Sequence, residues 1–330
     1  MRYLITGGAG FIGSHLADRL IQRGEYVHVL DNLSTGSVRN IRHLHSNKRF
    51  GFTIGDVLDS DTLEPLLKDA DRVVHLAAVV GVKLVMEQPV NTILINVQGT
   101  ENVLLLCCRY RKRVLVASTS EVYGKTMDGH SEIPALREED DITLGCTKKR
   151  RWAYGCSKAL DEFLARAYFD EDELEVVVPR FFNTVGPRQT GYYGMVVPRF
   201  VQQALAGDPL AVHGDGTQTR CFTHVADSVE AIIRLLEQPA AFGEIVNVGS
   251  EETVTINELA HRIIEMTGSS SPITHIPYTQ VYGPGYEDML HRTPDVSRLR
   301  KLIGFVPKRR LDETLRDVIA FYAPVQAVEV

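Results

Sequence analysis

Long apolar runs are missing from this 330-residue chain, because no stretch approaches the roughly 20 apolar residues that cross a bilayer. The first six residues, Met1 to Thr6, lead directly into a glycine turn, which leaves no room for the charged, apolar and small-residue regions of a signal peptide. We therefore expect a cytoplasmic protein without a membrane partner.

Cysteine is scarce as well, and the 5 cysteines form neither a CxxC pair nor a zinc-ligand spacing. We expect free thiols in a reducing compartment rather than disulfides. The histidines and carboxylates repeat no metal-ligand pattern either, and so we assign no metal.

A basic excess is also lacking, since 36 Lys and Arg stand against 42 Asp and Glu and the formal net charge is -6. Proteins that bind nucleic acid carry a basic excess on at least one face, and we therefore expect no nucleic-acid partner. The longest basic run spans residues 148–151, and we interpret it as a solvated turn before a helix.

What the chain does contain is an alternation of short β-branched runs with longer segments of helical periodicity. Such alternation is typical of βαβ units and a parallel sheet. We predict strands at 3–6, 26–30, 51–54, 72–76, 113–118 and 175–180, and helices at 14–23, 96–110 and 154–168. The fold class expected is α/β: a Rossmann-type doubly wound parallel sheet with a smaller C-terminal α/β domain that binds the substrate.

The alternation loosens after Arg180 into stretches rich in Gly and Pro. We expect a first, cofactor-binding domain over 1–180 and a discontinuous substrate-binding domain over 181–330. A β-like run at 244–248 is predicted to return to the main sheet, so that the first domain also includes about 215–250.

A glycine-rich turn follows the first predicted strand and opens the first helix. Gly7, Gly10 and Gly13 form a GxxGxxG pattern, in which glycine permits a tight turn and lets backbone N–H groups approach a pyrophosphate. Asp31 ends the second predicted strand, 18 positions after Gly13, where a carboxylate can bond the adenosine ribose and repel a 2′-phosphate. The pattern predicts NAD rather than NADP; the alternative is an ordinary strand–turn–helix connection with Asp31 as a cap.

The third predicted strand ends in Gly55-Asp56-Val57. This position lets Asp56 and Val57 reach the adenine, with a simple turn as the alternative.

A tyrosine and a lysine lie four residues apart on one face of a predicted helix. Tyr154 and Lys158 have their Cβ atoms about 6 Å apart at this spacing, so that the ammonium can lower the pKa of the phenol. Thr119 closes the fifth predicted strand, whose carboxyl end opens into the ligand crevice of a doubly wound sheet. We therefore expect Thr119 to bind a sugar hydroxyl beside Tyr154, with a polar cap at 118–120 as the alternative.

Together these motifs resemble the extended short-chain dehydrogenase/reductases of the nucleotide-sugar epimerase, dehydratase and decarboxylase family, over nearly the whole chain. The resemblance implies NAD, a UDP-sugar substrate, and a homodimer built on the helices near 96–109 and 154–168. It implies Thr119, Tyr154 and Lys158 as the catalytic set, with Ser120 and Glu121 beside them. The residues it assigns to the cofactor, besides the glycines, Asp31, Asp56, Val57, Tyr154 and Lys158, are Phe11, Ile12, Asn32, Thr35, Gly36, Leu76, Ala77, Ala78, Asn96 and Ser118.

The resemblance also implies a set of residues that bind the substrate. Asn183 would contact a diphosphate oxygen, and Arg220 and Arg292 would place guanidinium groups on the diphosphate or the sugar. Arg188 and Val197 complete this set. For the arginines, an ion pair within the protein is the alternative.

The run Thr119-Ser120-Glu121 bears on the reaction. Dehydratases of the family carry Thr-Asp-Glu here, and the missing acid at position 120 disfavours dehydration. Our first hypothesis is a 4-epimerase for UDP-glucuronate or UDP-glucose, which the segments 31–36 and 183–195 resemble. Our second is a UDP-glucuronate decarboxylase, which the Thr-Ser-Glu run, Arg151-Trp152-x-Tyr154 and the stretch 286–292 resemble. Glu121 would serve as an acid in the decarboxylase, and the alternative is a buried hydrogen-bonding neighbour of the loop. A third, from another class, is an NAD-sensing binding protein without turnover, which the intact Tyr154, Lys158 and Thr119 disfavour.

Overall fold

The computed structural model describes residues 1–129, 133–283 and 286–323. Its main feature is a parallel sheet in the order β12-β7-β5-β4-β1-β2-β3, with the short β6 paired to β7. The strands are β1 (Arg2–Thr6), β2 (Tyr26–Asp31), β3 (Phe50–Ile54), β4 (Arg72–His75), β5 (Arg113–Val116), β6 (Ser118–Thr119), β7 (Val176–Phe181) and β12 (Ile245–Val248). The Rossmann-type doubly wound sheet is confirmed, and so is the strand predicted at 244–248, which pairs in parallel with β7.

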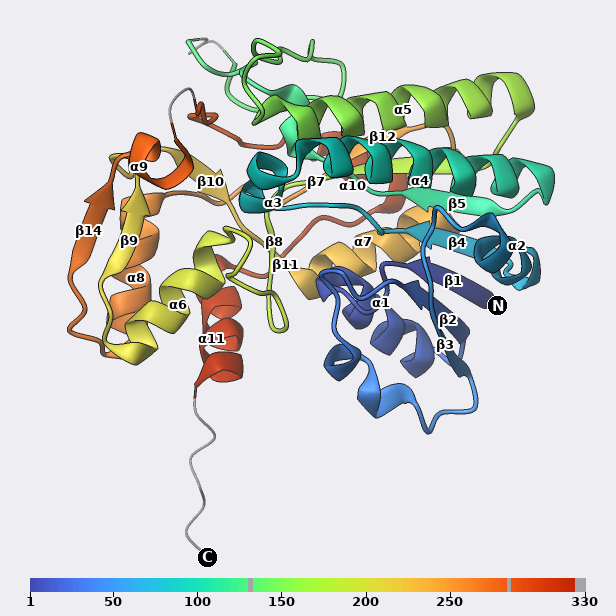
Figure 1. The fold of residues 1–330 in the computed structure, drawn as a ribbon, viewed down its shortest axis with the longest axis horizontal. Helices are drawn as coiled ribbons and strands as arrows, with labels where there is room; N and C mark the ends of the chain where they lie inside the picture. Colours follow the sequence, from blue (N-terminus) through green and yellow to red (C-terminus); the bar gives the residue numbers. More distant parts are fainter. Residues whose placement is uncertain (130–132, 284–285, 324–330) are drawn as a thin grey trace, which may run out of the picture.

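Helices cover both faces of this sheet (Figure 1). One face carries α2 (Ser60–Asp69), α3 (Val82–Glu87), α4 (Pro89–Arg109) and α5 (Trp152–Asp172), and the other carries α1 (Phe11–Gln22), α7 (Val225–Glu237) and α10 (Ser297–Ile303). The apolar residues of the strands alternate between the two resulting cores: Ile5 packs with the α1 side and Leu4 with the α2 side. Both are fully buried, as expected for parallel strands covered on both faces.

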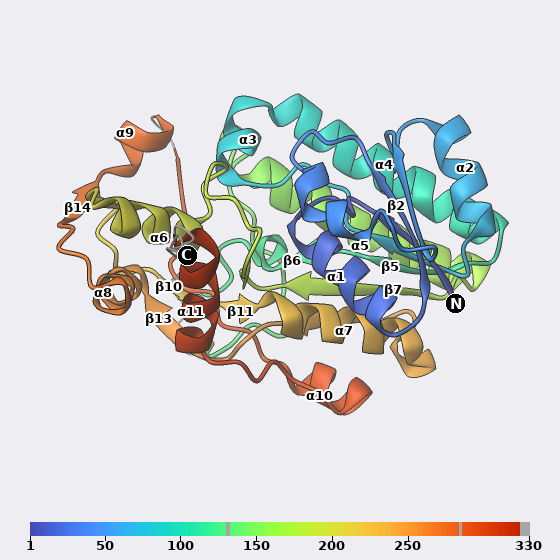
Figure 2. The ribbon, with the colours of Figure 1, turned by 90° about the horizontal axis from the view of Figure 1, so that it is seen from below.

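The remaining elements form a smaller unit at one end of the sheet. It contains α6 (Val196–Ala206), α8 (Ile256–Thr267), α9 (Tyr278–Tyr282) and α11 (Leu311–Tyr322), with a separate apolar core around Phe200 and Leu259. Figure 2 shows this unit beside the sheet from a second direction. Its strand pairs are β9 (Leu210–His213) with β14 (Ile273–Ile276), β10 (Thr219–Cys221) with β13 (Thr253–Thr255), and β8 (Thr184–Val185) with β11 (Thr223–His224).

The observed elements differ from the predicted ones at their ends. The strand predicted at 113–118 divides into β5 and β6, and the three predicted helices begin earlier, at Phe11, Pro89 and Trp152. Helix ends depend on caps and neighbours rather than on apolar periodicity, and such ends are the least secure part of a sequence-based assignment. No helix in the described part of the chain is long and apolar enough to cross a membrane.

Candidate active site

A cavity of about 550 Å³ opens between the carboxyl ends of the sheet strands and the smaller unit. Ligands of open α/β sheets bind at this edge. Residues from the glycine turn, from the ends of β2 to β7 and from the smaller unit line it. The predicted residues that it brings together are Gly7, Gly10, Phe11, Ile12, Gly13, Asp31, Asn32, Thr35, Asp56, Val57, Leu76, Ala77, Ala78, Ser118, Thr119, Ser120, Glu121, Tyr154, Lys158, Asn183, Arg188, Val197, Arg220 and Arg292.

The glycine turn forms one end of the cavity. Gly7 has φ +71, and a Cβ there would lie 2.7 Å from the backbone N of Ala77. A Cβ on Gly13 would lie 2.5 Å from the carbonyl O of Gly7. Because only glycine fits these two positions, backbone N–H groups at the start of α1 stay open to the cavity, where they can bind a pyrophosphate.

Asp31 stands beside this turn at the end of β2 and is 7% exposed. Its carboxylate accepts hydrogen bonds from the backbone N–H groups of Ala9 (2.9 Å) and Leu33 (2.8 Å). Burial raises the pKa of Asp31, although the backbone hydrogen bonds act in the opposite direction. The structure thus places a carboxylate next to the glycine turn, where it can meet the ribose of a dinucleotide.

Two predicted cofactor residues do not line the cavity. Gly36 packs against Asp31, whose carboxylate oxygens would lie 2.9 Å from a Cβ at that position. Asn96 is buried and bridges the loop after β4 to α5: its side chain bonds both backbone groups of Val79 and, at 3.2 Å, the hydroxyl of Ser157. Asn96 therefore steadies the walls of the site rather than facing a ligand.

Tyr154 and Lys158 both face the cavity from the first turns of α5. Lys158 is 2% exposed, and its Nζ donates to Asp161 Oδ2 at 2.6 Å. Burial raises the pKa of Tyr154, the carboxylate of Glu121 raises it further, and a side-chain hydrogen bond with Thr119 acts in the opposite direction. The net pKa of Tyr154 is thus raised in the protein by itself, and a lowering by Lys158 together with bound NAD stays a prediction.

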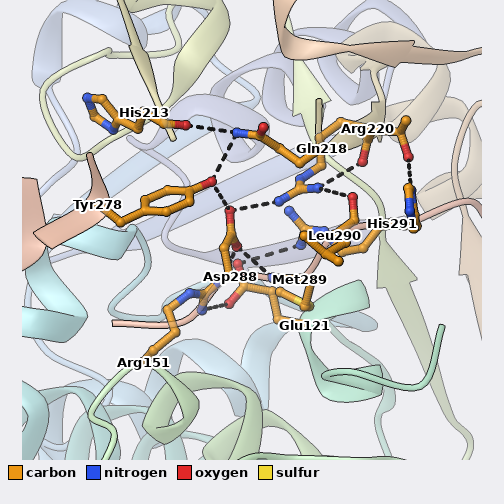
Figure 3. A network of polar contacts seen from close by, with 12 residues as sticks. Glu121, Arg151, His213, Gln218, Arg220, Tyr278, Asp288, Met289, Leu290 and His291 are labelled. Carbon is orange, nitrogen blue, oxygen red and sulfur yellow. Dashed lines mark hydrogen bonds and ion pairs between the residues drawn. The ribbon is translucent and has the colours of Figure 1, made fainter. Parts of the chain in front are cut away.

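The sugar end of the cavity holds a buried network of charges, shown in Figure 3. Arg151 pairs with Glu121, and Arg292 lies 3.7 Å from the same carboxylate. Arg220 pairs with Asp288 at 2.9 Å, and Arg151 lies 3.9 Å from it. Three guanidinium groups thus share two carboxylates, and the excess positive charge suits an anionic ligand.

Arg292 also contacts the Thr-Ser-Glu run, at Ser120. Its Nη1 lies 3.4 Å from Ser120 Oγ, and its Nη2 donates to Asn183 Oδ1 at 3.1 Å. Among the residues that the structure describes, none forms a hydrogen bond with its buried Nε. Asn183 also donates to the carbonyl O of Cys221, and within the described residues it therefore acts by holding Arg292.

Arg188, in the Gly-Pro-Arg turn, both lines the cavity and forms an ion pair within the protein. Arg188 lines the cavity, but its Nη2 pairs with Asp18 at 2.8 Å and its backbone φ is +69, in the left-handed region that glycine favours. Its buried Nη1 lacks a partner. Nη2 of Arg188 is thus used in an ion pair within the protein, which was the alternative to substrate binding. Nη1 can still bind a ligand.

The interpretation of the basic run 148–151 as a solvated turn is wrong for its last residue. Arg151 is 2% exposed and lines the cavity, whereas Arg150 is exposed and Lys149 pairs with Glu287. Arg151 precedes Tyr154 by three residues, a spacing that places two side chains on one helical face. That spacing was the sequence signal that could have identified it.

Other residues that line the cavity come from positions 278–288, of which the sequence pointed only to the Tyr286-Glu287-Asp288 stretch, through its similarity to decarboxylases. Tyr278, Tyr282 and Tyr286 stack on one another, with the rings of Tyr282 and Tyr286 4.3 Å apart, and all three face the cavity. Asp288 belongs to the same region. Tyr278 and Tyr282 lie at the two ends of the short helix α9.

No group of three or more potential metal ligands occurs within residues 1–129, 133–283 and 286–323. The cavity combines a glycine turn that can bind a dinucleotide, a buried tyrosine, and a cationic region that contains carboxylates.

Comparisons with known proteins agree with this geometry. A model of the "NAD dependent epimerase/dehydratase family" matches residues 3–249. Among curated proteins, the UDP-N-acetyl-alpha-D-glucosaminuronate decarboxylase of Bacillus cytotoxicus is 42% identical over 326 residues, which cover 98% of each chain. The UDP-glucuronic acid decarboxylase 1 of Danio rerio is 36% identical over 324 residues, 98% of this chain and 72% of the relative.

Solved structures give a second comparison. The UDP-glucuronic acid 4-epimerase of Bacillus cereus, in complex with UDP-glucuronic acid and NAD, superposes with a TM-score of 0.87 at 29% identity, covering 98% of this chain and 99% of that one. The UDP-glucose 4-epimerase of Thermotoga maritima with UDP-glucose also gives 0.87, at 28% identity and 98% coverage of both chains.

Proposed function

Because this chain belongs to the NAD-dependent epimerase/dehydratase family, we propose that it decarboxylates a UDP-activated hexuronic acid. It is an NAD-dependent enzyme that modifies UDP-sugars. The proposal rests chiefly on one feature of the site: the half-buried Glu121 and the buried Arg292 lie together beside Ser120, in the cavity that Tyr154 lines. The 36–42% identity to two decarboxylases over 98% of this chain supports it, and for that reason we rank it above the 4-epimerase hypothesis.

The residues of the cofactor end fit NAD. The glycine turn leaves space that a Cβ on Gly7 or Gly13 would fill, and Asp31 offers a carboxylate to the ribose. When bound, NAD supplies a reversible acceptor for the hydride from C4 of the sugar and a positive charge next to Tyr154. The carboxylate of Asp31 also disfavours a 2′-phosphate in its place.

Tyr154 acts on the C4 hydroxyl in this proposal. Its phenolate removes the proton from O4, and Thr119, beside it in the cavity, donates to the same oxygen. Because burial and Glu121 raise the pKa of Tyr154, the phenol is the stable form in the protein by itself, and the base forms only when positive charge is brought to it. Lys158 keeps its ammonium buried in the same cavity through Asp161.

The 4-keto sugar so formed is a β-keto acid. Its C5–C6 bond breaks, carbon dioxide leaves, and the electron pair moves into the C4–C5 enolate. C5 then takes a proton from the carboxyl of Glu121, and Glu121 regains its proton from water. Arg292 first binds the carboxylate of the substrate and then lies next to the enolate charge.

Incubation with NAD and with each of two substrates, UDP-glucuronate and UDP-N-acetylglucosaminuronate, tests the proposal. We expect carbon dioxide together with a UDP-pentose, or its 4-keto precursor, identified by NMR. Conversion of UDP-glucuronate to UDP-galacturonate, or of UDP-glucose to UDP-galactose, without carbon dioxide would instead establish the 4-epimerase. Binding of NAD and UDP without any product would favour the NAD-sensing protein.

We also propose a homodimer through the outer faces of α4 and α5. These helices pack along each other on one side of the sheet (Figure 1) and expose large apolar side chains to solvent. Exposed apolar patches of this kind mark interfaces. Sedimentation should give twice the chain mass of 36.8 kDa, and a monomer would contradict the proposal. The apolar residues are Val90, Ile93, Leu94 and Leu105 on α4, and Leu160 and Phe163 on α5.

A further inference from the structure

Asp288 lies where the two halves of the charged network meet (Figure 3). Its Oδ2 accepts from Arg220 at 2.9 Å and from the hydroxyl of Tyr278 at 3.2 Å. Its Oδ1 accepts from its neighbour's backbone N–H, that of Met289, at 3.0 Å and lies 3.9 Å from Arg151. Asp288 is therefore fixed in place and contacts one arginine on each side.

The charge of Asp288 follows from these contacts. Burial acts to raise its pKa, but Arg220 and then Arg151 more than offset this, and the pKa is lowered. Asp288 is thus an ionised carboxylate in a buried site, where a charge acts over longer distances than in water.

Glu121 experiences this charge through Arg151. The charged and titratable groups that face Glu121 are Arg151, Arg292, Tyr154 and Asp288. Burial acts to raise the pKa of Glu121, Arg151 and Arg292 lower it to below its ordinary value, and Asp288 acts to raise it. Two guanidinium groups alone would hold Glu121 firmly as a carboxylate, which is a poor proton donor.

We propose that Asp288 is a positioning residue: it orients Arg220 toward the diphosphate and shares Arg151 with Glu121, which keeps the Glu121 carboxyl able to carry the proton that C5 receives. The inference rests on the proposed function, in which Glu121 is that donor. Because Asp288 contacts both Arg220 and Arg151, a substitution of Asp288 should affect substrate binding and catalysis together.

Kinetics of Asp288→Asn test the proposal. KM for the UDP-uronate should rise, since Arg220 loses its partner. At neutral pH kcat should fall about tenfold, because a smaller fraction of Glu121 then carries its proton. The ratio of wild-type to variant kcat should shrink toward acidic pH, because acid protonates Glu121 in both proteins.

Two further variants serve as controls. Asp288→Glu keeps the charge and should retain the wild-type shape of the pH profile. Glu287→Gln removes the same charge from the adjacent residue, which pairs with Lys125 and Lys149 and does not line the cavity, and should leave kcat and KM unchanged. A wild-type to Asp288→Asn ratio that is equal at every pH would mean a merely structural role and would overturn the proposal.

A direct titration separates this inference from the proposed function. Protein labelled with ¹³C at the glutamate carboxyls, with the Glu121→Gln spectrum subtracted for assignment, reports the pKa of Glu121 without any turnover. We expect a lower pKa of Glu121 in Asp288→Asn than in the wild type. An unchanged titration would refute the role of Asp288, whereas a wild type that releases no carbon dioxide would refute only the decarboxylase.

Discussion

The two ends of the cavity are built in different ways. The cofactor end is built around the backbone of the turn between β1 and α1 and the carboxylates of Asp31 and Asp56, at the ends of β2 and β3. The sugar end consists of charged side chains from four separate segments, which carry Glu121, Arg151, Arg220, and the pair Asp288 and Arg292. The cofactor end depends on glycine at positions where no other residue fits. The sugar end depends on the balance between positive and negative side chains. They should therefore fail in different ways when changed.

The largest effect is expected at the chemical centre. Tyr154→Phe removes the proton acceptor for O4, and kcat should fall about 10³-fold, within the usual range for loss of a general base. NAD affinity should stay near the wild-type value, because the cradle is at the other end of the cavity. Steady-state kinetics and calorimetric NAD titration check both statements, and a parallel loss of NAD binding would show that the two ends are not separable.

The second largest effect is expected on the free energy of unfolding, when a charged residue of the sugar end is replaced. Arg151→Met leaves Glu121 buried beside a single, more distant guanidinium, and the free energy of unfolding should fall by about 3 kcal/mol. Arg150→Met changes an exposed neighbour and should stay within about 0.5 kcal/mol of the wild type. Denaturant titration of both variants measures the difference; equal stabilities would argue against a structural role of the Arg151–Glu121 pair.

At the cofactor end, a substitution should reduce NAD affinity through a steric clash in the glycine turn. Gly13→Ala places a Cβ 2.5 Å from the carbonyl O of Gly7, and the turn must shift. We expect NAD affinity to drop about 30-fold, or about 2 kcal/mol, while UDP affinity is retained. Calorimetric titration with each ligand separately measures both affinities. Loss of UDP affinity with unchanged NAD affinity would mean that the turn binds the sugar nucleotide instead.

The smallest effect is expected from the ribose carboxylate. Asp31→Asn keeps the shape but removes the charge, and NAD affinity should fall about tenfold, in line with a hydrogen bond to a charged group. The preference for NAD over NADP should narrow at the same time. If the variant still rejects NADP as strongly as the wild type does, a residue other than Asp31 must determine the selectivity for NAD.

The sequence allowed most of the large sheet to be predicted, together with nearly all of the cofactor end. Strands such as β1 and β4 are short runs with apolar residues at their centres, and the glycine turn with Asp31 is a local motif. The β9–β14 and β10–β13 pairs were not predicted, because each joins short segments far apart in the chain.

The sugar end was predicted only in part, for the same reason. Thr119, Tyr154 and Arg292 were identified, but the burial of Arg151 was not, since its partner Glu121 lies 30 residues away and in a different element. The pairing of Lys158 was not predicted either. Spacing placed Lys158 on the same helical face, but Asp161, one turn further on, takes up its ammonium.

The fate of C6 tests the central claim most directly. UDP-glucuronate labelled with ¹³C at C6 is incubated with the protein and NAD in D₂O, and the products are followed by NMR. The account predicts that the label leaves as carbon dioxide and that the UDP-pentose carries one deuterium at C5, from the exchangeable proton of Glu121. Label that remains in a UDP-hexuronate, with C4 inverted and no deuterium at C5, would contradict it.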